Sequence, residues 1–380
     1  TLQYEMSYSN IVNMLDLAGI PIRTAERRRE DPFVCCGGPC AYHAEPLADL
    51  MDFFILGEGE EVNSEIMDVY KTWRSSGRPR EDYLAEIAKI QGVYVPSFYD
   101  VTYNEDNTIA SFAPNRPGVP KKVKKRIIQD MDNTYIPEKL IVPFMETVHD
   151  RIMLELFRGC IRGCRFCQAG YIYRPVRERS VEKLLSVAEN SIAATGYEEM
   201  SMASLSTSDY TRLFELTDGL LDLTVDKKIN LSLPSLRVDN FSMELMEKVQ
   251  KVKKSGLTFA LEAGTQRLRD VINKNVLEED LIRTAKIAFS GGYNRIKLYF
   301  MLGLPTETME DVLGIGKLAQ KVIDAYKEKG GAPWHDSKTT VFGQVVSGMD
   351  VVQKICNLPQ TENVPQEDVI VTNITLRTVE

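Results

Sequence analysis

The chain has 380 residues, of which 43% are hydrophobic and 26% charged, as expected for a globular protein of two or three domains. Its formal net charge of −8 argues against a general nucleic-acid binder and leaves room only for a local RNA contact. No apolar run approaches the roughly 18 residues that a membrane span needs, and no signal peptide opens the chain. Six of the seven cysteines fall in two tight clusters, which indicates a reduced compartment, so we expect a cytoplasmic protein without a membrane partner.

Residues 1–75 alternate helix-like and strand-like segments. A helix through "IVNMLDLAGIP" ends at Gly19 and Pro21, and the strands in "DPFVCCGGP" and "FFILGEGEE" each run into a glycine turn. "EPLADLMD" and "VNSEIMDVYKTW" have helical patterns. This order predicts a parallel sheet. Because the chain enters a helical pattern at once and lacks an initiator Met, we expect it to begin partway through a domain.

Residues 76–145 are rich in Pro, Gly and Asn and contain two strand-like pieces, "GVYVPSFYDV" and "TIASFAP". We interpret them as a connector that packs in part on its neighbours. The basic run "KKVKKR" at 121–126 is typical of a solvated stretch, with a nucleic-acid contact as the alternative.

Residues 146–328 repeat strand–helix units. The strand "IMLELF" at 152–157 precedes the cysteine loop, and Ser180 caps a helix that Gly196 ends. Four more strands are expected in "EMSMASLS", "INLSLPS", "LTFALEAG" and "RIKLYFMLGLP". Helices are expected from about 209, through "MELMEKVQKV", twice after the fourth strand and from about 308. Five strands with helical crossovers predict a (β/α) barrel whose active site lies at the carboxyl ends of its strands.

Three cysteines stand within "FRGCIRGCRFCQAG", at Cys160, Cys164 and Cys167. A structural zinc site needs four ligands, and only His149, which precedes the strand, could complete one. Buried structural thiols are a second alternative, although Arg158, Arg162 and Arg165 make the loop strongly cationic for a core segment. The third is a [4Fe–4S] cluster held by three thiolates, with one iron open to a ligand and arginines that stabilise the anionic cluster.

The C-x-x-x-C-x-x-C spacing, with Phe166 before the last cysteine, resembles that of the radical S-adenosylmethionine (SAM) enzymes. The resemblance implies that the open iron chelates the amino and carboxylate groups of SAM. Electron transfer from the cluster to the sulfonium then generates a 5′-deoxyadenosyl radical, which requires an electron donor such as flavodoxin or ferredoxin.

Later strand ends resemble the segments that contact SAM in this superfamily. These are "SMASLSTSDY", "LSLPSLRVDN", "ALEAGTQRLRDVINKN" and "YFMLGLPTET". Arg237 could bind the carboxylate as a fork, and Glu262 would lie near the ribose or amino group. The alternatives are a structural ion pair between Arg237 and Glu262, and serines that only cap turns. By this resemblance the residues that contact SAM are Ser206, Ser208, Ser232, Arg237, Glu262, Gly303 and Pro305.

"VCCGGPCAYHAEPLADLMDFFILGEGEE" resembles the second half of the cobalamin-binding domain that precedes many radical SAM barrels. The Asp-x-His-x-x-Gly motif that supplies the cobalt ligand in many cobalamin domains is absent. His43 could ligate the cobalt instead, and the alternative is that His43 is a surface histidine beside a turn without such a role. Cys35, Cys36 and Cys40 could suggest a second metal site, but neighbouring strand residues point to opposite faces, which favours buried thiols. Glycines let the backbone approach a bulky ligand closely. By this resemblance, the residues that contact cobalamin are these glycines and two of their neighbours: Gly37, Gly38, Pro39, Gly57 and Glu58.

Residues 329–380 form a β-rich tail in which "GGAPWHDSKTTVFGQVVSGMDVVQKI" resembles the end of cyclophilin-type peptidyl-prolyl isomerases. Trp334 matches the proline-pocket Trp, and Thr339 stands where a His is common. The remaining catalytic strands are absent, so we expect no isomerase activity. The seam near Tyr326–Gly331 indicates two partial genes joined by fusion, misassembly or design.

The sequence thus predicts an α/β protein with part of a Rossmann-like cobalamin-binding domain, a partial (β/α) barrel of the radical SAM type and a short β-rich tail. The expected function is reductive SAM cleavage for cobalamin-assisted methylation or another radical modification of an unidentified substrate. A cyclophilin-type isomerase and a non-catalytic fusion fragment are the alternatives.

Overall fold

The computed structural model describes residues 1–137, 139–145, 147–234, 237–239, 244–245, 248, 256–329, 349–361 and 364–365. The chain divides into two units, Thr1–Gly331 and Ala332–Glu380. No helix within the described ranges is long and apolar enough to cross a membrane.

The first part of the larger unit is a small α/β body. Its elements are α1 (Tyr8–Leu17), β1 (Cys35–Cys36), β2 (Phe53–Ile55), α2 (Gly59–Ser76), α3 (Arg80–Ile87) and β3 (Val93–Tyr94). Strands β1 and β2 pair in parallel, as the alternating pattern predicts, while β3 joins β2 in antiparallel orientation. The helix expected in "EPLADLMD" is instead a 3-10 turn at Glu45–Leu47.

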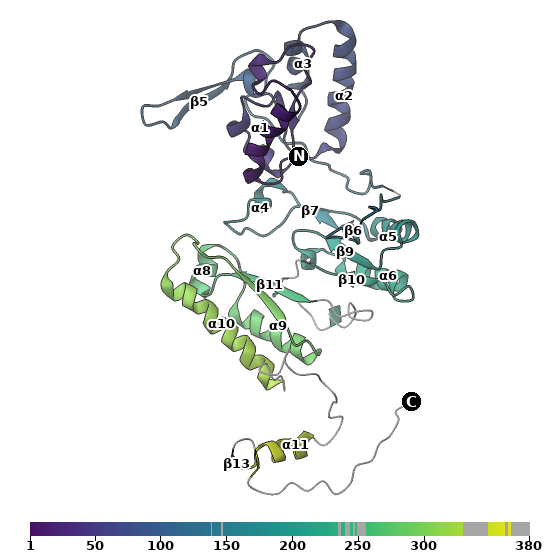
Figure 1. Cartoon of the computed structure of the whole chain (residues 1–380), viewed down its shortest axis with the longest axis vertical. Coiled ribbons are helices and arrows are strands. Elements are labelled where there is room, and N and C mark those ends of the chain that lie inside the picture. Colours follow the sequence, from purple (N-terminus) through teal and green to yellow (C-terminus); the bar gives the residue numbers. More distant parts are fainter. Residues whose placement is uncertain are drawn as a thin grey trace. The chain divides into compact units, whose positions relative to one another are not determined.

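The core of this body continues past residue 75. Tyr83 and Ile87 of α3 and Val93 of β3 are buried with Phe54 and Trp73 in one cluster. The rest of the expected connector carries an antiparallel hairpin of β4 (Tyr99–Tyr103) and β5 (Ile109–Pro114), visible as the long ribbon labelled β5 in Figure 1. The hairpin is antiparallel and largely exposed.

The second part of the larger unit has the expected strand–helix repeat. Its parallel strands are β6 (Ile152–Glu155), β9 (Glu199–Ala203), β10 (Asn230–Ser232), β11 (Leu257–Glu262) and β12 (Ile296–Phe300). They form one sheet of order β10-β9-β6 and a pair β11-β12, and no pairing joins β10 to β11 among the described residues. The result is an open, partial barrel, with α5 and α6 on one sheet and α9 and α10 beside the other (Figure 1).

The remaining elements of this part connect or cover the strands. They are β7 (Phe157–Arg158), α4 (Ala169–Ile172), β8 (Arg177–Glu178), α5 (Val181–Thr195), α6 (Leu213–Thr224), α8 (Gln266–Val271), α9 (Glu278–Ser290) and α10 (Met309–Glu328). The ends of α5 are those expected. The Ser180 hydroxyl accepts a hydrogen bond from Lys183 N at 3.1 Å, and Gly196 takes the left-handed conformation, with φ +69°.

The expected helix "MELMEKVQKV" lies largely outside the described residues. In the smaller unit the structure describes α11 (Met349–Cys356) and an antiparallel pair, β13 (Gln360–Thr361) and β14 (Val364–Pro365). Trp334 and Thr339, which the cyclophilin resemblance singled out, are also outside the described residues.

Candidate active site

The three cysteines follow the first barrel strand, as expected. Strand β7 leads into Gly159 and Cys160, and the loop closes through Cys167 N, which donates to Cys164 O at 3.1 Å. Gly159 has φ +93°, and a Cβ there would lie 2.6 Å from Pro175 O, so a glycine must precede Cys160.

Cys160, Cys164 and Cys167 line a single cavity of about 260 Å³. Three of the residues that the SAM resemblance singled out line it too: Ser206 after β9, Arg237 after β10 and Glu262 at the end of β11. The rest of the wall consists of Arg162, Phe166, Leu205, Val238, Ala260, Lys274 and Val276. The cavity thus gathers the carboxyl ends of three parallel strands around the cysteine loop.

The other four candidates for SAM contact are not among the lining residues of this cavity. The Ser208 hydroxyl accepts from Arg237 N at 3.3 Å and so fixes the segment that carries Arg237. Ser232 is the last residue of β10. Gly303, with φ +81°, donates its N–H to the Glu307 carboxylate at 2.6 Å, and Pro305 is exposed in the same turn.

The arginines of the cysteine loop also bind protein groups, and Arg162 in addition interacts electrostatically with Cys160. Arg158 pairs with Glu155 at 2.8 Å and Glu60 at 2.7 Å. Arg162 forms a fork onto Asp209, and its N–H groups also lie 3.5 Å from Asp239. Arg165 donates to the Val271 carbonyl. Their charges hold the loop in place.

The proposed structural ion pair between Arg237 and Glu262 is also wrong, because each has a different partner. Arg237 forms a fork onto Asp239 at 2.9 and 3.1 Å. Glu262 accepts from Lys274 Nζ at 3.0 Å, and both side chains are nearly buried. Glu262 also has φ +70° at a bulge between β11 and β12, a conformation that is rare outside glycine and that turns its side chain away from the regular pleat.

Two pKa shifts describe the field around the cavity. Burial raises the pKa of the Cys164 thiol, and the positive charges of Lys274 and Arg237 oppose that rise. Burial would also raise the pKa of Asp209, but the hydrogen bonds and positive charge of Arg162 hold it below its ordinary value. The cations nearest Cys164 therefore come from the later strands and not from its own loop.

The residues of the cavity fit a cluster held by three thiolates. As the side chains stand, no group of three His, Cys, Asp or Glu side chains among the described residues is arranged to hold a metal ion. The fit therefore rests on the shared cavity, on the chemistry of three free thiols and on the cations beside Cys164.

The glycine turns that the cobalamin resemblance singled out are packed against the chain itself. A Cβ on Gly57 would lie 2.0 Å from Arg126 O, and one on Gly38 would lie 2.6 Å from Leu2 O. Gly38, Pro39, Gly57 and Glu58 line a cavity of about 160 Å³, which Gly37 does not line. At Gly38 and Gly57 the absence of a Cβ therefore permits a close approach of protein backbone.

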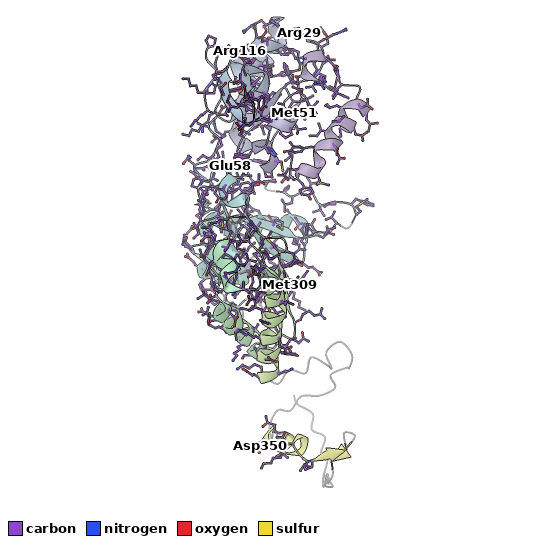
Figure 2. The ribbon with its side chains drawn as sticks, turned by 90° about the vertical axis from the view of Figure 1, so that its left-hand side faces the viewer. Arg29, Met51, Glu58, Arg116, Met309 and Asp350 are labelled. Carbon is purple, nitrogen blue, oxygen red and sulfur yellow. The ribbon has the colours of Figure 1, made fainter. Side chains whose placement is uncertain are left out.

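Glu58, labelled in Figure 2, joins the two parts of the larger unit. Its carboxylate accepts from Arg177 at 2.6 Å and from Ile128 N, and Arg158 lies at 3.6 Å. His43 is exposed. The expectation of buried thiols is confirmed for Cys36 and Cys40 and is wrong for Cys35, which is exposed.

Sequence reasoning missed several residues of the site. Lys274 and Leu205 line the cavity, and Asp209 and Asp239 anchor its two arginines. The sequence contained one usable signal, the run "NKN" at 273–275, since Asn tolerates left-handed backbone and often marks a tight turn.

An open parallel α/β barrel with three thiols at its strand ends defines the class of protein. Residues 1–96 match the family model for the N-terminal region of radical SAM proteins, and residues 154–319 match the model for the radical SAM superfamily. Residues 325–376 match the model for cyclophilin-type peptidyl-prolyl cis-trans isomerases. The chain is therefore similar to radical SAM proteins over residues 1–96 and 154–319 and to cyclophilin-type isomerases over residues 325–376.

The chain is also similar to one curated protein and to two solved structures. An uncharacterized protein of Methanocaldococcus jannaschii is 31% identical over 325 residues, which cover 85% of this chain and 62% of that protein. The cobalamin-dependent SAM radical enzyme OxsB, solved with aqua-cobalamin and SAM, has a TM-score of 0.52 at 12% identity, covering 84% of this chain and 44% of OxsB. The radical SAM methyltransferase TsrM of Kitasatospora setae, solved with cobalamin and a [4Fe–4S] cluster, has a TM-score of 0.47 at 15% identity, covering 78% of this chain and 55% of TsrM. The chain thus spans about three fifths of its curated relative and less than half of OxsB.

Proposed function

We propose that this chain binds a [4Fe–4S] cluster through Cys160, Cys164 and Cys167 and cleaves SAM reductively. The observation that supports this function is the cavity of about 260 Å³ that the three thiols share with Ser206, Arg237 and Glu262. When bound, the cluster supplies one electron to the sulfonium of SAM, and a small donor such as flavodoxin or ferredoxin would provide that electron.

The residues of the chain have separate tasks in this function. The thiolates hold the cluster, and Lys274 and Arg237 favour the ionised form of Cys164. Leu205, Val238 and Val276 supply an apolar wall that limits water around a reactive radical. Glu262, at the end of β11, offers a carboxylate to the amino or hydroxyl groups of the bound molecule.

We propose cobalamin as a second cofactor of this function and do not extend the function to prolyl isomerisation. Gly38, Pro39, Gly57 and Glu58 line a cavity of about 160 Å³, and the cobalamin-dependent enzyme OxsB has a similar fold. The cyclophilin-type match is confined to residues 325–376, and Trp334 lies outside the described residues.

The test is anaerobic reconstitution with iron and sulfide, followed by metal analysis and a SAM cleavage assay under reducing conditions. Wild-type protein should hold a cluster and release 5′-deoxyadenosine, and Cys164→Ala should lose both. Cys35→Ala, which removes an exposed thiol on β1, is the matched control and should behave as wild type. A Cys164→Ala variant that kept a full cluster and SAM cleavage would contradict the proposal.

A further inference from the structure

Lys274 is a cation of the cysteine cavity to which no motif assigns a role. It follows α8, lines the same cavity as the three thiols, and has a nearly buried side chain. Its ammonium donates to Glu262 Oε1 at 3.0 Å and lies 5.9 Å from the centre of the Phe166 ring. A lysine ammonium has three donors, so this bond to Glu262 uses one of them.

The turn that carries Lys274 is held in an unusual conformation. Asn273 and Asn275, on either side of it, both have left-handed backbone, with φ +54° and +50°. Asn273 Nδ2 donates to Gly163 O at 2.8 Å, and Arg165 N donates to Ile272 O at 2.9 Å. Left-handed residues outside glycine persist only where surrounding contacts enforce them, and they concentrate at functional sites. The turn is thus fixed directly to the cysteine loop.

The two arginines of the cavity have their guanidinium forks directed at carboxylates. Arg162 binds Asp209 and approaches Asp239 at 3.5 Å. Arg237 binds Asp239 through two N–H groups and also donates to the carbonyls of Lys274 and Asn275 at 3.4 Å. By contrast, Lys274 and its partner Glu262 both belong to the cavity wall. An ammonium beside a carboxylate is complementary to a zwitterionic ligand. The ammonium of the protein pairs with the carboxylate of the ligand, and the carboxylate of the protein pairs with its amino group.

We propose that Lys274 binds the carboxylate at the amino-acid end of SAM, in place of the fork of Arg237 that the sequence suggested. This inference rests on the proposed function, because it takes SAM as the occupant of the cavity. Binding a carboxylate there gives the Lys274 ammonium a second charged partner beside Glu262, and hydrogen bonds between charged groups are stronger than neutral ones.

The test measures the affinities of two ligands for two proteins, wild type and Lys274→Met, by equilibrium dialysis. Both proteins carry the cluster. S-adenosylhomocysteine keeps the amino-acid end without the reactive sulfonium, and its decarboxylated thioether lacks only the carboxylate. Wild type should bind S-adenosylhomocysteine about tenfold to a hundredfold more tightly than the decarboxylated thioether, while in Lys274→Met this ratio should fall at least about fivefold. The remaining preference belongs to the open iron of the cluster, which would also bind the carboxylate. Lys286→Met, which removes an ammonium 2.7 Å from Glu328, is the matched control and should keep the wild-type ratio.

Each outcome decides the question. A Lys274→Met ratio equal to that of wild type overturns the role of Lys274 and leaves the proposed function intact. Wild-type protein that binds neither thioether and holds no cluster overturns the proposed function and this inference with it. Should Lys274→Met fail to fold by circular dichroism, Lys274→Arg replaces it; this variant keeps the charge and should keep a preference for the carboxylate, whose loss would contradict the inference.

Discussion

The side-chain amide of Asn273 donates to the backbone carbonyl of Gly163 at 2.8 Å, joining two loops that lie 110 residues apart in the sequence. A Cβ on Gly163 would lie 3.0 Å from this amide nitrogen, so a small residue is needed at the contact. Gly163 stands between Cys160 and Cys164. This hydrogen bond therefore ties the cysteine loop to the segment that follows β11 and α8. The position of the thiols therefore depends on the β11–α8 region as well as on the loop itself.

Replacing Asn273 should weaken cluster retention. Asn273→Ala removes the hydrogen bond to Gly163. It also places an alanine at φ +54°, a left-handed conformation that costs alanine about 1–2 kcal/mol of folding free energy. Asn273→Gly removes the bond but allows the backbone angle. We expect both variants to lose iron faster than wild type against a chelator, and only Asn273→Ala to show a lower urea midpoint.

The matched control is Asn107→Gly, at another left-handed Asn, with φ +62°, between β4 and β5. It should retain iron as wild type does. If Asn273→Gly held its cluster as long as this control, the bond to Gly163 would have no part in positioning the loop.

The elements that depend on local sequence were predicted well. Ser180 and Gly196 bound α5 because capping and left-handed termination are local properties of the residues concerned. The five barrel strands appear where apolar runs alternate with helical patterns, among the described residues. The cysteine spacing placed three thiols on one loop, and their shared cavity follows from the position of that loop at the end of β6.

Long-range pairing could not be predicted from the sequence. Nothing local indicates that Arg162 meets Asp209 or that Lys274 reaches Glu262. The packing of the glycine turns was missed for the same reason. A glycine required by an approaching backbone, as Gly57 is by Arg126, looks in the sequence like one that leaves room for a ligand.

The packing role of Gly57 can be tested directly. Gly57→Ala places a Cβ against Arg126 O at φ +115°, which should cost about 3 kcal/mol or more because neither backbone can move freely. Gly77→Ala is the matched control, since Gly77 also has positive φ, +71°, but no atom within 4 Å of the new Cβ, and it should cost about 1 kcal/mol. Urea unfolding of both variants provides the measurement, and equal losses would contradict a packing role specific to Gly57.

Glu58 should make the stability of the protein depend on pH. Burial would raise the pKa of its carboxyl, but hydrogen bonds from Arg177 and Ile128 N, together with the charges of Arg177 and Arg158, hold it below the ordinary 4.5. A depressed folded pKa means that the folded state binds the proton less readily than the unfolded state. The stabilisation is therefore present in full above the unfolded pKa and is lost as pH falls through the folded one.

Glu58→Gln keeps the size of the side chain and removes the charge. At pH 7 the variant should be about 1–3 kcal/mol less stable than wild type, because a charge-assisted bond to Arg177 becomes a neutral one. The difference should begin to shrink once the pH falls below about 4.5, as wild-type Glu58 gains its proton. Urea midpoints of both proteins, followed from pH 7 to about pH 3, give this difference directly, while other carboxylates cancel in the comparison. If the difference in stability between the two proteins stayed constant over this range, or grew as the pH fell, the charge of Glu58 would not be what joins the α/β body of residues 1–94 to strands β7 and β8.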